Sequence, residues 1–327
     1  MNKAAALLAM MMALLVVARA DQHSDPDPFG FLHPTIQFSD DERQRLDGRA
    51  VVLRILPAGG RELAALAAGA VEVGPDALVE SVKNIVDLKK GALVPQIGRF
   101  SSPPRLEDVQ PLTLDDVDME AIRRCRPDGC ALKLTAEEIE RLQRASDINT
   151  EFRRVIVDRT AEYLRRGEDL TKEESAQLVR HSPYIQARMP ELVSYLDRFP
   201  AERLAGSESF LYWSKETYAW KPMISVTHVT ILRGSGGAAP EVVIASRDVF
   251  ATRYTSGSLV LTFLFHNPST SRRYLVYINR TWVDAVRALW RPFVEHRIKS
   301  QARNVFNDAR ARIERYGRAA RSGFSGK

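Results

Sequence analysis

Residues 259–265 read LVLTFLF, and this stretch decides the fold. Its odd positions are all apolar, as on one face of a β-strand, yet Val260 and Leu264 make the other face largely apolar too. A strand with two apolar faces needs cover on both sides. The stretch therefore predicts a central strand in a sheet that is packed on each face.

The same two-residue periodicity continues on both sides of this stretch, from about Ser207 to Ile278. It predicts six strands, at residues 210–218, 223–232, 242–245, 249–255, 259–265 and 274–278. Their connections, such as GSGG at 234–237, are too short to contain crossover helices. The sheet should therefore be mostly antiparallel.

A long amphipathic helix is predicted after the last strand. One apolar stripe runs through Trp282, Val286, Leu289, Phe293, Val305, Ala309, Ile313 and Tyr316. We expect Asn279 or Thr281 to cap the start of this helix. Pro292 should kink or split it, because proline has no N–H to donate and clashes with the preceding turn.

The earlier part of the chain predicts strand, strand and helix, at residues 51–56, 71–73 and 75–88. A proline-rich irregular stretch should follow to residue 111, and then a helical section over residues 113–205. Three capping-box patterns mark helix starts in that section: Thr113 with Asp116, Thr135 with Glu138, and Thr171 with Glu174.

The first residues predict export. Lys3, an apolar run from Ala4 to Ala18 and the sequence Ala18-Arg19-Ala20 match a secretory leader, with cleavage after Ala20. The run is shorter than the roughly 20 residues that span a bilayer, which favours a cleaved leader and a periplasmic or extracellular product. Residues 21–48 should form a flexible lead-in that ends in a short capped helix, with order beginning near Ala50.

Export changes the interpretation of the two cysteines, Cys125 and Cys130. The intervening Pro127, Asp128 and Gly129 favour a turn that brings the two thiols together. In an oxidising compartment the favoured interpretation is a local disulfide. A redox pair or a metal site is the alternative, but the C-x-x-C spacing and further ligands for it are absent from the sequence. We expect no metal and no cofactor.

Charge is concentrated at the C-terminal end. The chain has a formal charge of +6, but residues 287–327 contain eleven Lys and Arg against three Asp and Glu, so the body is acidic overall. The terminal helix could contact anionic lipid headgroups, or its arginines could simply keep a solvated face soluble. Residues 319–327 should form a disordered basic tail. Nucleic acid is a poor partner for an exported protein whose basic residues are not interleaved with aromatic ones.

Strong catalytic signatures are absent: the sequence has no G-x-S-x-G, H-E-x-x-H, P-loop or G-x-G-x-x-G motif. Among six scattered histidines, His228 is notable because it lies in the middle of a predicted strand. A buried neutral histidine explains this position more simply than a general base does. The sequence leaves enzymatic activity uncertain, and a binding role is favoured.

A pocket between the sheet and its cover would be lined by the aromatic residues of the strands. The candidate ligand-binding residues are Tyr212, Trp213, Tyr218, Trp220, His228, Tyr254 and Tyr277. The competing interpretation is that all of them belong to an ordinary core.

The order of elements resembles the helix-grip arrangement of the START-like, or polyketide cyclase-like, superfamily. The resemblance covers residues 50–88 and 207–316, and it rests on element order. It implies an α+β fold, over residues 49–318, in which an antiparallel sheet grips a long C-terminal helix around a cavity. Residues 113–205 would then be a large helical insertion, and the cavity would take an apolar ligand.

These observations lead to one main hypothesis and two alternatives. We expect an exported soluble protein that binds or carries a hydrophobic small molecule or lipid between the sheet and the C-terminal helix. The alternatives are a structural or interaction protein of the cell envelope and a cofactor-free enzyme acting on a small apolar substrate.

Overall fold

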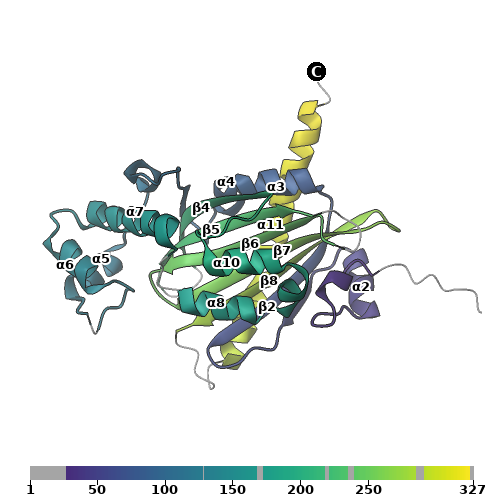
Figure 1. Cartoon of the computed structure of the whole chain (residues 1–327), viewed down its shortest axis with the longest axis horizontal. Coiled ribbons are helices and arrows are strands. Elements are labelled where there is room, and N and C mark those ends of the chain that lie inside the picture. Colours follow the sequence, from purple (N-terminus) through teal and green to yellow (C-terminus); the bar gives the residue numbers. More distant parts are fainter. Residues whose placement is uncertain are drawn as a thin grey trace, which may run out of the picture.

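The computed structural model describes residues 27–127, 129–167, 172–217, 221–234, 239–284 and 291–324. An eight-stranded antiparallel sheet forms its centre, and helices cover both faces (Figure 1). The predicted fold class is confirmed: an antiparallel sheet grips a long C-terminal helix, and a large helical section is inserted between two strands.

The sheet has the strand order β1-β2-β8-β7-β6-β5-β4-β3. The strands are β1 (Val52–Ile55), β2 (Glu62–Val71), β3 (Gln96–Arg99), β4 (Ser207–Glu216), β5 (Met223–Arg233), β6 (Val242–Ala251), β7 (Thr255–Asn267) and β8 (Arg272–Val283). From β4 to β8, each strand pairs with the next one along the chain, as the short connections predicted.

The described helices fall into four groups along the chain. The N-terminal ones are η1 (Gly30–Leu32) and α2 (Asp40–Asp47), and α3 (Pro75–Lys83) and α4 (Ile85–Lys89) follow β2. Between β3 and β4 lie η2 (Leu106–Val109), α5 (Asp116–Arg124), α6 (Ala136–Arg144), α7 (Ile148–Arg166), α8 (Lys172–Arg180), α9 (Pro183–Arg188) and α10 (Pro190–Arg198). The last helix is α11 (Arg291–Phe324).

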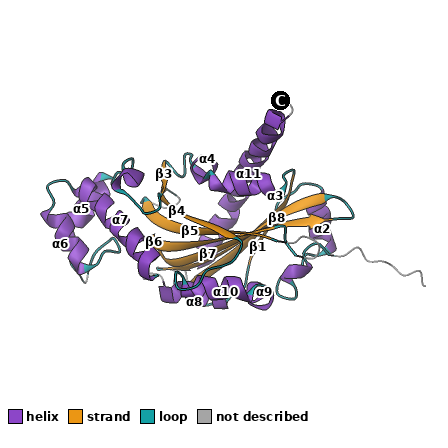
Figure 2. Cartoon of the chain, turned by 45° about the horizontal axis from the view of Figure 1, so that its top comes forward, coloured by secondary structure: helices purple, strands orange, loops and turns teal. Residues whose placement is uncertain are grey.

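The two faces of the sheet have different covers (Figure 2). We call the side with α3, α4 and α11 the grip face, and the opposite side, which carries α8, α9 and α10, the insertion face. Because side chains alternate along a strand, each strand supplies both faces. On β7, for example, Phe263 packs in the core of the insertion face and Leu264 in the core of the grip face.

Helix α11 is fixed to the sheet by a few close contacts. Phe306 packs over Gly69 of β2, where any side chain would collide with its ring. Arg312 donates to the carbonyl oxygens of Asp87, Leu88 and Lys90, which are the free acceptors at the end of α4. Beyond these contacts, the C-terminal end of α11 projects past the edge of the sheet (Figures 1 and 2).

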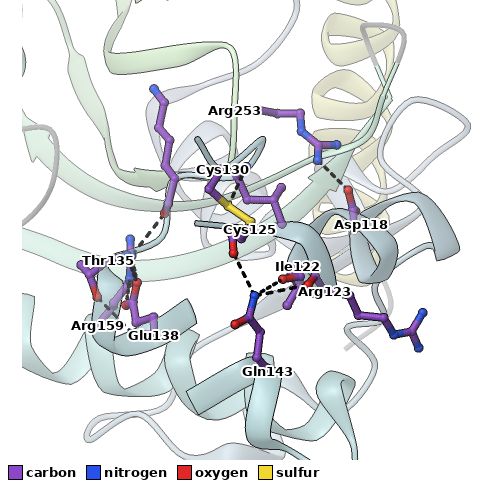
Figure 3. The surroundings of a disulfide bond; sticks show 12 residues. Asp118, Ile122, Arg123, Cys125, Cys130, Thr135, Glu138, Gln143, Arg159 and Arg253 are labelled. Atoms are coloured by element: carbon purple, nitrogen blue, oxygen red, sulfur yellow. Dashed lines mark hydrogen bonds and ion pairs between the residues drawn. A yellow bond between two sulfur atoms is a disulfide. The ribbon is translucent and has the colours of Figure 1, made fainter. Parts of the chain in front are cut away.

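The first part of the insertion is held by the predicted disulfide (Figure 3). Cys125 and Cys130 are joined, with their Cα atoms 4.4 Å apart. Gln143 of α6 donates to the carbonyl oxygens of Ile122 and Cys125, at 3.0 and 2.9 Å, and so ties the end of α5 to α6. The disulfide therefore fixes a local turn, as expected.

A buried ion pair connects α5 to the sheet. Arg253, just after β6, donates to Asp118 of α5 at 2.7 Å, and both side chains are less than a tenth exposed.

Thr135 and Glu138 form the capping box that the sequence predicted for α6. The prediction for Thr113 is wrong, because Asp115 occupies the N-cap position of α5, although its side chain makes no capping hydrogen bond. Thr171 lies outside the described residues.

The N-terminal part is more ordered than the sequence indicated. Ser39 caps α2 in a capping box with Glu42, which confirms the predicted short helix. Order does not begin near Ala50, however. Phe29, Leu32 and Phe38 are almost completely buried against β7 and β8, because the insertion face needs apolar cover at that end. The predicted leader, residues 1–20, lies outside the described residues.

Near the C-terminus, two expectations are wrong. Strand β8 continues to Val283, so Asn279 and Thr281 are strand residues and cap no helix. The predicted kink at Pro292 stays a prediction, because residues 285–290, which precede the described part of α11, lie outside the described residues. The helix also continues to Phe324, past the expected start of a disordered tail at residue 319.

Some of the strand positions predicted from the sequence are also wrong. Residues 242–251 form one strand, β6, and not two, because a local irregularity beside Val226 and Thr227 of β5 absorbs the break in periodicity. The sequence predicted a strand only at residues 71–73, whereas β2 runs over Glu62–Val71. The strand was missed because its alanine-rich sequence has little strand preference. The proline-rich stretch contains a short edge strand, β3.

Candidate functional site

The predicted ligand-binding residues do not gather at one place. Tyr212 and Tyr277 lie on the grip face, whereas Trp213 and His228 lie on the insertion face. Tyr254 lies in the tight connection between β6 and β7. Tyr218 and Trp220 lie outside the described residues.

Trp213 has a packing role on the insertion face. Its side chain has no exposed surface, and its indole Nε1 donates to the carbonyl oxygen of Asp108 at 2.8 Å. The ring lies against Gly98 of β3 so closely that an added Cβ would be 2.6 Å from Nε1. Trp213 therefore joins η2, β3 and the sheet.

His228 is a buried neutral histidine. Its Nδ1 lies 2.7 Å from the hydroxyl oxygen of Tyr163, and the Phe199 ring is 4.6 Å from its own ring, centroid to centroid. Burial, and secondarily the positive charge of Arg247, lower the pKa of His228 to about 3. A group with this pKa is a weak base at neutral pH, which argues against a role in proton abstraction.

Tyr254 shapes a turn. Its φ of 69° lies in the left-handed region, and its hydroxyl accepts a hydrogen bond from the Lys221 amide at 3.0 Å. Its carbonyl oxygen also accepts from the Asp284 amide at 2.8 Å. These bonds hold the end of the sheet together.

The grip face carries a polar cluster that the sequence did not reveal. Lys89, the last residue of α4, places its ammonium group 3.0 Å from the carboxylate of Glu216 and 3.0 Å from the hydroxyl of Tyr212. Ser214 donates to the same Glu216 oxygen at 2.9 Å and lies 3.3 Å from Ser225. Tyr212, one of the predicted residues, is therefore part of a connected network.

Asp248 of β6 extends this cluster across the sheet. The strand register aligns Tyr212 of β4 with Thr227 of β5, and Thr227 with Asp248. Thr227 donates to the Asp248 carboxyl group at 2.8 Å, and Ser258 of β7 hydrogen-bonds to it from the other side. Four adjacent strands thus contribute to one polar row.

The acidity of Asp248 is strongly altered. Burial, and next the negative charge of Glu216, raise the pKa of Asp248 to about 7, although its hydrogen bonds and Lys89 act in the opposite direction. Asp248 as a residue is nevertheless only partly buried, so some of its surface reaches solvent. We call its surroundings on the grip face the Asp248 site.

Neighbouring residues of the grip face are partly accessible as well. They lie in the middle of β6, β7 and β8, where side chains would be buried if both faces of the sheet were fully covered. Ser246, Val260 and Asn279 form one row across the three strands, and Thr262 and Tyr277 form the next. We call the partly accessible residues the central strip: Ser246, Asp248, Val260, Thr262, Tyr277 and Asn279.

The central strip is accessible because the helices of this face cover its two sides. Helices α3 and α4 bury one end of the face with Leu78, Val79, Val82 and Ile85. Helix α11 packs on β1 and β2 and against α3 and α4. The strip between them, together with the polar row that ends at Asp248, is the candidate site.

This arrangement can bind a small molecule that has both apolar and polar parts. Val260 and the Tyr277 ring offer apolar contact, whereas Asn279, Thr262, Ser246 and Asp248 offer hydrogen bonds. No cluster of three metal-ligating side chains occurs in the described ranges. Within the same ranges, no helix is both long and apolar enough to span a bilayer.

The comparisons with known proteins were largely negative. No protein-family model and no curated protein matches this sequence. Among solved structures, the chain is similar to an aromatase/cyclase, ZhuI, from Streptomyces sp. R1128, at 18% sequence identity and a TM-score of 0.26. The similarity covers 45% of this chain and 90% of that one, and it is too distant to assign an activity.

Proposed function

We propose that this protein binds a small organic molecule on the grip face, over the central strip and next to Asp248. One observation carries the proposal: side chains in the middle of three central strands stay partly accessible on this face, whereas their neighbours on the insertion face are buried. Concave, partly apolar surfaces with a few convergent polar groups are the usual form of ligand sites.

The residues that line the central strip change which kind of ligand we expect. A purely hydrophobic molecule or a lipid tail would displace water from Asp248 and Asn279 without replacing its hydrogen bonds, which is costly. The lining favours an amphipathic molecule, with an apolar body over Val260 and Tyr277 and a polar group near Asp248. A lipid fits only if its headgroup occupies the polar end.

Native mass spectrometry of the protein purified from its own source tests this function. We expect a co-purifying small molecule that survives desalting and is released by organic extraction. Ser246→Phe should fill the strip and abolish the additional mass, whereas Ser246→Ala should retain it at similar thermal stability. Equal ligand content in the two variants would contradict a site over the central strip.

Export is part of the proposal. It rests on the leader-like sequence of residues 1–20, and the Cys125–Cys130 disulfide supports it, because such bonds persist in oxidising compartments. The intact mass of the protein recovered from its source should correspond to a chain that starts at Asp21. A chain that retains Met1 would contradict cleavage.

A cofactor-free enzyme remains the second candidate, and Asp248 is the observation that favours it. An acid with a pKa near 7 can both donate and accept a proton at neutral pH, as acid–base catalysis requires. If a turnover is detected, Asp248→Asn should reduce kcat at least about a hundredfold, the usual contribution of such a group. His228→Gln should leave it within a few-fold of wild type.

A further inference from the structure

The charged groups that act most strongly on Asp248 make its surroundings anionic. Glu216 of β4 and Lys89 of α4 carry charge, and Glu216 has the larger effect on this carboxyl group. Thr227 of β5 and Ser258 of β7, which hydrogen-bond to it, are neutral hydroxyls. When Glu216 and Asp248 are both ionised, together they carry one more charge than Lys89 neutralises.

The protein's own lysine shows what this surface can hold. The Lys89 ammonium group lies 5.0 Å from the centroid of the Tyr212 ring and within 3.0 Å of both the Tyr212 hydroxyl and the Glu216 carboxylate. A carboxylate, an aromatic ring and a hydroxyl are the groups that recognise an alkylammonium ion. Asp248, with Thr227 and Ser258, continues the same polar row towards the central strip.

We propose that the Asp248 site recognises a small organic cation, an amine with an apolar body, whose ammonium group is bound by Asp248 and whose body lies over Val260 and Tyr277. This inference rests on the proposed binding function and adds the chemical class of the ligand. The ammonium group would share the anionic field of Glu216 with Lys89. The partly accessible Tyr277 ring offers the body an aromatic contact within the strip.

Binding of a cation should be linked to a proton. Because burial and Glu216 raise the pKa of Asp248 to about 7, part of the free protein carries a protonated Asp248 at neutral pH. A bound ammonium group favours the ionised carboxylate, so that a proton is released. Affinity for a permanently protonated amine should therefore rise about tenfold as the pH rises from about 6 to about 8.

Three probes of similar shape and different charge test the inference: phenethylamine, phenethyl alcohol and hydrocinnamate. Isothermal titration calorimetry at neutral pH should show that the amine binds at least about tenfold more tightly than the alcohol, and that the carboxylate binds most weakly. Titrations in two buffers of different ionisation enthalpy should reveal proton release on binding of the amine.

Two variants provide the matched comparison. Asp248→Asn should abolish the preference for the amine, its pH dependence and the proton release. Glu208→Gln changes an acid on the same strand and face as Glu216, but one that pairs with Lys83 and lies roughly 27 Å along β4. This control should bind the amine as wild type does.

The outcomes separate the two proposals. Equal affinity for amine and alcohol, or an amine preference that survives in Asp248→Asn, overturns the cation assignment and leaves the binding function standing. Failure of all three probes to bind also overturns it, whereas the co-purification experiment judges the binding function independently. If Asp248→Asn does not fold, proton release and the pH dependence of wild type decide the question.

Discussion

Gly69 of β2 lies directly beneath Phe306 of α11, so close that a Cβ at residue 69 would come within 2.7 Å of the aromatic ring. This contact sets how near the C-terminal helix approaches the sheet. It also sets one boundary of the grip face on which the candidate site lies.

Gly69→Ala should therefore destabilise the protein by about 1–3 kcal/mol, because the ring or the helix must shift to admit the methyl group. Phe306→Leu alone should also be destabilising, but the double variant should lose less than the sum of the two. Urea unfolding measures these values. Gly59→Ala, at a position with open space around it, is the control, and an equal loss there would contradict the contact.

Asp248 should make wild-type stability fall as the pH rises. Its pKa is raised from 3.8 to about 7, so the folded state holds a proton that the unfolded chain has already released. The resulting stabilisation is complete below about pH 4 and is lost as the pH rises through about 7. Asp248→Asn should consequently melt at a higher temperature than wild type above pH 7. If the difference in melting temperature between wild type and Asp248→Asn did not change with pH, the raised pKa of Asp248 would be contradicted.

His228 should have the opposite effect on the acid side. Its pKa is lowered from 6.5 to about 3, so the unfolded chain gains a proton below pH 6.5 while the folded state stays neutral. Stability is therefore lost as the pH falls from about 6.5 towards 3. His228→Gln should be less stable at pH 7, by roughly 1–2 kcal/mol, since it disturbs the contacts with Tyr163 and Phe199. Its melting temperature should decline less steeply between pH 6.5 and 4, which thermal denaturation would reveal.

The predicted contact of α11 with anionic lipid can be tested at arginines chosen from the structure. Arg310 and Arg312 donate to backbone carbonyls of β2 and α4, so replacing them would disturb the fold. Arg315 and Arg318 are exposed on the last third of α11. Replacing both with Gln should weaken sedimentation with phosphatidylserine-containing vesicles, by about 1 kcal/mol for each cation.

A charge-matched control distinguishes this effect from loss of net charge. Arg123 and Arg124 are exposed on α5, which lies at the left of Figure 1, well away from the C-terminal end of α11. Replacing both with Gln should leave vesicle binding unchanged. Equal weakening in the two double variants would mean that the net charge of the protein, and not the position of the arginines on α11, determines vesicle binding.

The sheet could be predicted because its signal is local. The two-residue periodicity and the short connections determine which strands pair, and they do so without reference to the rest of the chain. What periodicity cannot show is which face a given aromatic residue occupies. Both faces of β4 are apolar, so Tyr212 and Trp213 were grouped although they point in opposite directions.

The candidate site was missed for two physical reasons. The polar residues Ser246, Arg247 and Asp248 interrupt an apolar stretch, which is typical of a connection between strands, whereas β6 continues through them. Arg247 then points to the insertion face and Asp248 to the grip face. Lys89 and Glu216 are far apart in sequence, and only tertiary packing brings them together. An isolated carboxylate within an apolar strand was the available signal.

The polar row that runs from Tyr212 to Ser258 also has a consequence for how the protein folds. Tyr212, Thr227, Asp248 and Ser258 belong to consecutive hairpins, so contacts between near neighbours in the chain assemble the base of the site. The walls, α4 and α11, come from distant parts of the sequence and meet through Arg312. Short loops close at less entropic cost than long ones, so the base should form early and the walls should dock last.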